Sequence, residues 1–217
     1  MSLTAHYYTK FESGNFYHVY NRSVDRKPMF KSEDNYRFFL KQYDHYLSGV
    51  VDTYAYCLMG NHFHLLVRVP DISDLSTEPT DLSTFEKLTN QPDGEKSVHQ
   101  VVSHQFRKLF QSYAQAFNKQ QDRTGTLFQT PFKRALVDSD QYFTQLVYYI
   151  HANPQLHGLI DDFRDWKWSS YGSILLDKPT KIKRQEVLNW FGTIERYKES
   201  HGPDQKVIYN PKYIFED

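Results

Sequence analysis

The stretch Met59–Val67 (MGNHFHLLV) constrains the fold more than any other part of the chain. Apolar residues alternate after a Gly-Asn turn, which is typical of a β-strand, where residues two apart share a face. His62 and His64 would then lie side by side. The opposite face would consist of Phe63, Leu65, Val67 and Val69. The pattern predicts a strand with a core on one face and two imidazoles on the other.

Two imidazoles at this spacing suit a divalent metal, because neutral imidazole nitrogen is a common ligand. The same spacing also occurs on strands that bind nothing. The strand itself supplies no carboxylate, so further ligands must come from elsewhere in the chain.

Composition permits one sizeable domain and excludes several classes of protein. The 217 residues are 39% hydrophobic and 24% charged, as in a soluble globular protein. The single cysteine, Cys57, excludes an internal disulfide and a cysteine-based zinc site, and it fits a reducing cytosol. No apolar run approaches the roughly 18 residues of a membrane span. We therefore expect a cytoplasmic protein with no membrane partner.

The net charge is zero, so the chain lacks the overall basic signature of a nucleic-acid-binding protein. The charge is uneven, however. Asp71–Glu95 carries seven acids and one base, whereas Ser97–Val137 carries six bases and one acid. The basic segment could contact phosphates, or both segments could be solvated faces of opposite sign.

The order of predicted elements indicates the fold class. We expect strands over 16–23, 50–58 and from His62, helices over 32–48 and 98–120, and a strand over 127–137 interrupted at Pro131. Residues 71–96 read as a polar insert. This βαββαβ order predicts an α+β protein with a ferredoxin-like antiparallel sheet and helices on one face.

An additional helix is predicted from about Asp140 to His151, ended by Asn153-Pro154. Its apolar stripe consists of Phe143, Leu146, Val147 and Ile150. At about 100° per residue, Tyr149 and Asn153 share one edge beside this stripe, and Tyr148 points towards solvent. If the stripe packs on the sheet, that edge can face the two histidines.

These residues make a chemically sensible set. Two imidazoles and the Asn153 amide oxygen could hold Mg²⁺ or Mn²⁺, and the Tyr149 hydroxyl could attack a phosphate that the metal polarises. From the spacing alone, Tyr149 is more simply a packed aromatic residue and Asn153 a residue at the end of a helix.

Five motifs follow one another along about residues 14 to 175. They are Tyr17–Arg22 (YHVYNR), Tyr56–Val67 (YCLMGNHFHLLV), Gly125–Lys133 (GTLFQTPFK), Tyr149–Pro154 (YIHANP) and Trp168–Tyr171 (WSSY). In this order they resemble the single-tyrosine HUH transposases, named for histidine–hydrophobe–histidine. Among these, the sequence is most similar to the REP-associated tyrosine transposases.

The resemblance implies a ferredoxin-like fold and a metal-dependent, site-specific transposase that acts on single-stranded DNA. Tyr149 would cleave the strand through a 5′-phosphotyrosine intermediate that leaves a free 3′-hydroxyl for rejoining. His62, His64 and Asn153 would hold Mg²⁺ or Mn²⁺. The DNA would be a hairpin or palindromic repeat. The family includes homodimers and monomers, so both states remain open.

The resemblance also implies a division of the chain into a catalytic domain and an extension. A catalytic domain would span residues 1–176 with the insert 71–96, which is longer than the family's usual connection. An extension, residues 177–217, has no clear counterpart and fits either a DNA contact or a small helical cap. We expect phosphate contacts from Arg22, Arg68, Lys108, Lys133 and Arg134.

Two other functions remain compatible with the sequence. One is a non-catalytic DNA-binding regulator of repeat elements on the same scaffold, against which the intact set of His62, His64, Tyr149 and Asn153 argues. The other is a hydrolytic or redox metalloenzyme that combines the two histidines with a carboxylate.

Overall fold

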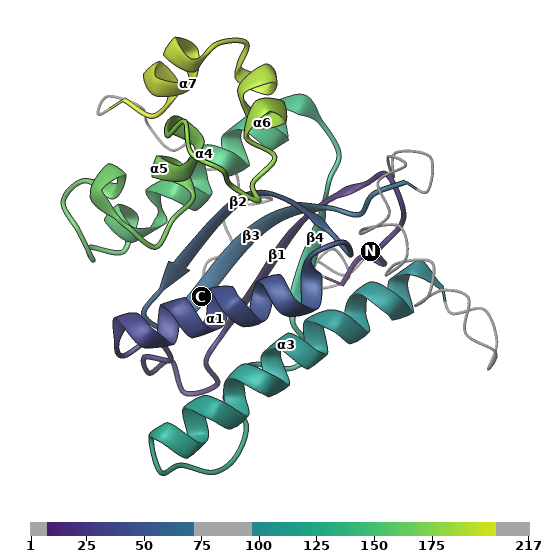
Figure 1. The fold of residues 1–217 in the computed structure, drawn as a ribbon, viewed down its shortest axis with the longest axis vertical. Helices are drawn as coiled ribbons and strands as arrows, with labels where there is room; N and C mark the ends of the chain where they lie inside the picture. Colours follow the sequence, from purple (N-terminus) through teal and green to yellow (C-terminus); the bar gives the residue numbers. More distant parts are fainter. Residues whose placement is uncertain (1–7, 72–96, 203–217) are drawn as a thin grey trace.

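A four-stranded antiparallel sheet organises the computed structural model, which describes residues 8–71 and 97–202. The strands are β1 (Phe16–Arg22), β2 (Asp52–Met59), β3 (His62–Arg68) and β4 (Lys133–Val137), in the order β2-β3-β1-β4. Helix α1 (Glu33–Leu47) follows β1, and α3 (Val98–Gln120) follows β3 in the chain. The predicted α+β class with a ferredoxin-like sheet is confirmed (Figure 1).

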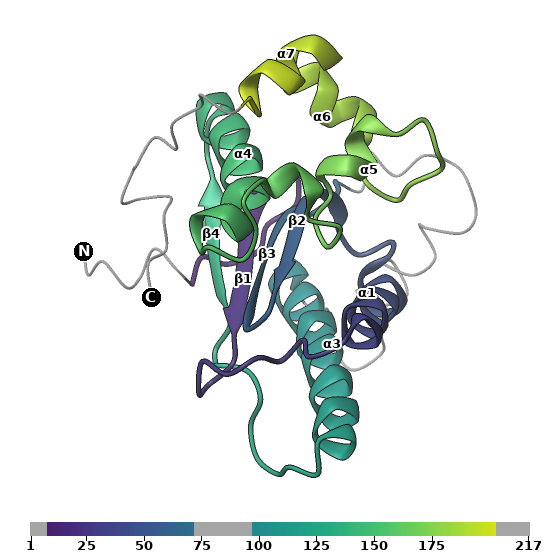
Figure 2. The ribbon, with the colours of Figure 1, turned by 90° about the vertical axis from the view of Figure 1, so that its left-hand side faces the viewer.

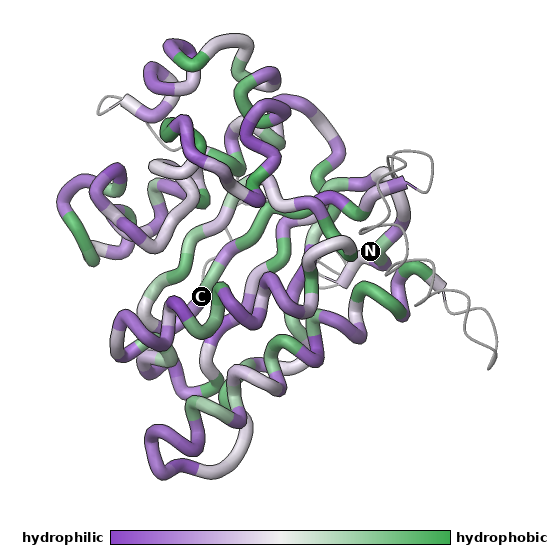
Figure 3. Tube along the Cα trace, in the orientation of Figure 1, coloured by the Kyte–Doolittle hydropathy of each residue, from purple (hydrophilic) through white to green (hydrophobic). Residues whose placement is uncertain are grey.

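Helices α1 and α3 cover one face of the sheet, as the edge-on view in Figure 2 shows. The apolar residues of β3 predicted for this face, Phe63, Leu65, Val67 and Val69, are all buried in the core below these helices. Both helices alternate hydrophilic and hydrophobic stretches along their length, whereas the strands are mostly hydrophobic (Figure 3). Burial of this face therefore fixes which face of β3 its histidines occupy.

The opposite face is covered by α4 (Asp140–Leu156), which packs on β2 and β3. Ser139 begins this helix, and its hydroxyl accepts a hydrogen bond from the Tyr142 N–H. All four residues of the predicted stripe are buried in the core on this face: Phe143, Leu146, Val147 and Ile150. The predicted packing of the stripe on the sheet is confirmed.

Beyond α4 the chain forms η3 (Phe163–Asp165), α5 (Tyr171–Leu175), α6 (Arg184–Phe191) and α7 (Ile194–Ser200). Trp190 of α6 stacks on Phe143 of α4, with ring centroids 4.3 Å apart. The described part of the extension is therefore helical and packed against the tyrosine-bearing helix. The division into residues 1–176 and 177–217 stays a prediction.

Two predicted boundaries were wrong. Helix α4 does not end at Asn153-Pro154 but continues to Leu156, because a proline there removes only the hydrogen bond to the Ile150 carbonyl. The His157 N–H still donates to the Asn153 carbonyl at 3.0 Å. Strand β4 begins at Lys133 rather than Leu127, since the chain before Pro131 pairs instead with the loop after β1, where Ser23 bridges Phe128.

Part of the predicted insert, residues 72–96, lies outside the described residues, as do residues 1–7 and 203–217. Among the helices that the structure does describe, none has the length and apolarity needed to cross a membrane.

Candidate active site

The two histidines of β3 lie beneath α4 rather than on an open surface. His62 is 8% exposed and His64 is 3% exposed. The Tyr149 ring meets the His64 ring edge-on, with centroids 5.6 Å apart. The structure therefore brings the predicted histidine pair and the predicted nucleophile together.

The neighbouring tyrosine of α4 has different surroundings. Tyr148 does not point to solvent as predicted: it is half-buried, with its ring 5.9 Å from Phe163 and 5.5 Å from His201. Tyr148 does point away from the sheet, as helical geometry predicts, but η3 and the end of α7 cover this side of α4. Burial raises the pKa of Tyr148.

A small hollow of about 30 Å³ lies between β1, β3 and α4. Its lining residues are Tyr20, Asn21, Arg22, His62, His64, Gln129, Lys133, Tyr149 and His157. Two of them are cationic and none is a carboxylate. Among the described residues, the lining thus lacks the acid that a metalloenzyme with a carboxylate ligand would need.

Asn153, the predicted third metal ligand, is not among the residues that line this hollow. Its side chain is fully buried one turn after Tyr149, and its Nδ2 is 3.4 Å from the Tyr149 carbonyl, to which it donates. Its Oδ1 accepts no hydrogen bond from the described residues. That buried oxygen retains its capacity to bind a donor or a cation.

The sequence interpretation missed His157, which lies two turns after Tyr149 and contributes a third imidazole to the lining. Its ring centroid is 5.0 Å from that of His62. The available signal was the interval of eight residues, which at about 100° per residue places His157 about 80° from Tyr149, within one broad face of a helix. Within the described part of the chain, no three His, Cys, Asp or Glu side chains are grouped so as to hold a metal ion.

The interpretation also missed His18 of β1, which lies next to His64. The His18 Nε2 and the His64 Nδ1 are 2.9 Å apart, and both rings are buried. Burial lowers the pKa of His18 to about 3 and that of His64 well below its usual value. Both imidazoles are therefore neutral at pH 7. Their shared face was readable, since Val19 beside His18 belongs to the opposite, apolar face.

His62 has its own partner in the turn before β3. The His62 Nδ1 is 2.6 Å from the Asn61 Oδ1, and the Asn61 Nδ2 donates to the Arg26 carbonyl at 2.8 Å. The oxygen and the nitrogen of the Asn61 amide thus each have a hydrogen-bond partner.

The predicted phosphate contacts fall into two groups. Arg22 and Lys133 line the hollow. Arg68 lies at the other end of β3, roughly 20 Å from His62 by strand geometry, and pairs with Asp71 at 3.3 Å. Arg134 is buried and donates to the Thr9 carbonyl at 2.6 Å, and Lys108 is exposed on α3. DNA contact by these five residues stays a prediction.

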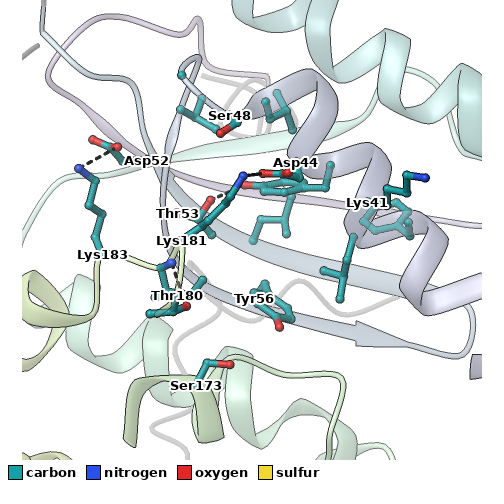
Figure 4. Close-up of a pocket in the computed structure, with 18 of the residues that line it drawn as sticks. Lys41, Asp44, Ser48, Asp52, Thr53, Tyr56, Ser173, Thr180, Lys181 and Lys183 are labelled. Atoms are coloured by element: carbon teal, nitrogen blue, oxygen red, sulfur yellow. Dashed lines mark hydrogen bonds and ion pairs between the residues drawn. The ribbon is translucent and has the colours of Figure 1, made fainter. Parts of the chain in front are cut away.

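A larger cavity, of about 760 Å³, lies between α1, β2 and residues 180–183 (Figure 4). Lys183 pairs with Asp52 at 3.1 Å and Lys181 pairs with Asp44 across its mouth. None of the predicted site residues lines it. Five of the predicted site residues instead line the small hollow: Arg22, His62, His64, Lys133 and Tyr149.

Comparisons with known proteins agree with this picture. No family model matches the chain. Over 121 residues it is 28% identical to a protein of Haemophilus influenzae named "Putative REP-associated tyrosine transposase", a match that covers 55% of this chain and 58% of that protein. The matched part is thus less than two thirds of that relative's length.

A solved structure of a REP-associated tyrosine transposase bound to a REP hairpin matches with a TM-score of 0.57. The match covers 81% of this chain and 86% of the other, at 14% sequence identity, which shows a shared fold. Sequence and fold therefore confirm the resemblance: this chain is similar to the REP-associated tyrosine transposases.

Proposed function

We propose that this protein is a metal-dependent transposase that cleaves and rejoins single-stranded DNA at hairpin or palindromic repeats. The observation that carries the proposal is the contact of Tyr149 with His64 in a hollow that His62 also lines. A hydroxyl-bearing ring and two imidazoles thereby share one small volume. The proposed substrate is supported by the similar protein of the same fold, whose structure contains a REP hairpin.

The proposed reaction exchanges one phosphoester for another. The Tyr149 oxygen forms a bond to the scissile phosphorus and loses its proton, and the bond from phosphorus to the 3′ oxygen breaks. The 3′ oxygen leaves as a hydroxyl, having taken up a proton, and the phosphate stays on the 5′ end as a phosphotyrosine. Rejoining is the reverse step with another 3′-hydroxyl, so no external energy source is needed.

The residues present fit a divalent cation, Mg²⁺ or Mn²⁺. His64 is held as the free base, the form that ligates, because burial lowers its pKa. His62 and His64 would hold the ion. The third ligand would be the Asn153 Oδ1, which accepts no hydrogen bond from the described residues. When bound, the ion supplies Lewis-acid polarisation of the phosphate.

The other groups of the hollow have roles that follow from their charge. The cationic side chains of Arg22 and Lys133 would attract the scissile phosphate and offset its charge as the Tyr149 oxygen approaches. The Lys133 Nζ lies 5.6 Å from the centre of the Tyr20 ring, which directs the ammonium group along the sheet face.

The test is incubation with labelled single-stranded hairpin oligonucleotides and Mn²⁺, followed by a denaturing gel. The unaltered protein is expected to form a covalent adduct. Tyr149→Phe should abolish the adduct and leave hairpin binding largely intact, because only the attacking oxygen is removed. Tyr148→Phe is the matched control and should keep the adduct. An adduct that survives in Tyr149→Phe but not in Tyr148→Phe would overturn the assignment.

The low exposure of Tyr149 favours a second candidate function. Tyr149 is only 6% exposed, which suits a DNA-binding role that makes no use of its hydroxyl. A non-catalytic regulator of repeat elements would bind the hairpin and give no adduct with either Mg²⁺ or Mn²⁺.

A further inference from the structure

We propose that Asn61 and His18 are positioning residues that fix the tautomers of His62 and His64. Each would engage the Nδ1 of one histidine and leave its Nε2 with the lone pair. The proposal rests on the proposed function, because it concerns the two histidines that would hold the metal.

The assignment for His62 follows from the two hydrogen bonds of the Asn61 amide. The Asn61 Nδ2 donates to the Arg26 carbonyl at 2.8 Å, and a carbonyl can only accept, so this atom must be the nitrogen. The atom 2.6 Å from the His62 Nδ1 is therefore the amide oxygen. An oxygen of this kind only accepts, so the His62 Nδ1 carries the proton. In the neutral ring the lone pair is then on Nε2.

The turn that carries Asn61 is held from the loop between β1 and α1. The Ser23 N–H donates to the Asn61 carbonyl at 2.9 Å, and the Met29 N–H donates to the Gly60 carbonyl at 2.8 Å. The backbone of Asn61 is thus held by hydrogen bonds, and its side-chain amide is held by the Arg26 carbonyl. It is built to hold the His62 ring in one orientation.

The assignment for His64 rests on a contact between two imidazoles. The His18 Nε2 and the His64 Nδ1 are 2.9 Å apart, and one proton lies between them. The rings are stacked, with centroids 5.0 Å apart and an interplanar angle of 26°. We assign the proton to the His64 Nδ1, because the opposite direction would leave the His64 Nε2 protonated and unable to ligate.

Both histidines thus have an acceptor at Nδ1. The β2–β3 turn supplies it for His62, and strand β1 supplies it for His64. Residues that ligate metals through one imidazole nitrogen usually donate the other N–H to a fixed acceptor. The separation of 2.9 Å between the His18 Nε2 and the His64 Nδ1 fits a single shared proton. Neither Asn61 nor His18 needs to touch the metal or the DNA.

The test is ¹⁵N long-range NMR of the metal-free protein labelled at histidine, which reports the tautomer of each ring. We expect the Nδ1–H form for both His62 and His64. Asn61→Ala should change the tautomer of His62 alone, and His18→Phe that of His64 alone. Asn61→Asp and His18→Gln retain an acceptor oxygen and should restore the Nδ1–H form. An Nε2–H ring at either position in the unaltered protein would overturn the proposal.

Mn²⁺ binding, followed by electron paramagnetic resonance, gives a second readout. Asn61→Ala and His18→Phe should weaken Mn²⁺ binding by about 10- to 100-fold, and the two acceptor-retaining variants should not. Unchanged affinity in the first two variants would overturn the positioning roles. If both Nδ1–H tautomers are found but no DNA adduct forms, the proposed function fails while the tautomer assignment stands.

Discussion

Two adjacent tyrosines of α4 show how single residues acquire different chemistry. Tyr149 contacts His64, whereas Tyr148 contacts Phe163 and His201 on a different side of the helix. The rotation of about 100° between successive residues separates them, and this much was predictable from the sequence. The segments that cover Tyr148 could not be predicted, because the sequences of η3 and α7 carry no periodic signal that places them against α4.

At the residue scale we predict that acidification destabilises the protein partly through His201. This side chain is fully buried, and burial lowers its pKa to about 4, although the Tyr197 carbonyl opposes the shift. The unfolded chain binds a proton below about pH 6.5, and the folded protein does so only near pH 4. The free energy of unfolding should therefore decrease as the pH is lowered through this window, by about 1.4 kcal/mol per pH unit for this group.

Urea unfolding at several pH values between 7.5 and 4.5 checks this prediction. The groups that surround His201 are His151, Ser200 and the aromatic rings of Tyr148, Phe163, Tyr171, Phe191 and Tyr197. None of these is a carboxylate that could stabilise the charged ring. His201→Phe should flatten the dependence, and a slope as steep as that of the unaltered protein would contradict the assignment.

At the scale of elements, periodicity decided what could be predicted. The long amphipathic helix α3 matches its predicted bounds, and α1 and β3 are close to theirs, because core packing enforces one face of each. The last turn of α4 was missed because a proline near a helix end costs only one hydrogen bond. Asn61, His18 and His157 were missed as site residues because their roles depend on contacts between elements.

Helix α4 is held by its apolar stripe, so we predict that Leu146→Ala costs about 2–5 kcal/mol of unfolding free energy. Leu146 is completely buried against the sheet, and its loss would leave a cavity under the helix that carries Tyr149. Leu156→Ala is the matched control on the same helix, because Leu156 is 52% exposed. It should change stability by less than about 0.5 kcal/mol. Urea unfolding of both variants measures the two free energies of unfolding. An equal decrease in both variants would contradict the packing of Leu146 against the sheet.

At the scale of the whole molecule, both edges of the sheet have neighbouring segments in the described structure. The Leu58 N–H of β2 donates to the Trp168 carbonyl, and the Lys183 N–H donates to the Thr53 carbonyl. On the other edge, Tyr8 bridges Arg134 of β4. An edge occupied in this way is less open to pairing with another chain.

The cations nearest the histidines occur at one end of the sheet, which leads to a prediction about DNA binding. Arg22 and Lys133 line the hollow, whereas Arg68 is at the far end of β3 and is paired with Asp71. Each cation that contacts a phosphate displaces a counterion, so its loss lowers affinity and makes binding less dependent on salt.

Arg22→Gln and Lys133→Gln should therefore each weaken hairpin binding and reduce the slope of log affinity against log salt by about one. Arg68→Gln is the comparison. It should also reduce the slope if the DNA extends along the whole sheet, and it should leave the slope unchanged if the DNA stays at the end that carries the hollow. Fluorescence anisotropy with a labelled hairpin, titrated at several salt concentrations, measures both quantities. If Arg68→Gln lowers the slope and the other two variants do not, DNA crosses the far end of the sheet, and cleavage by Tyr149 could not follow.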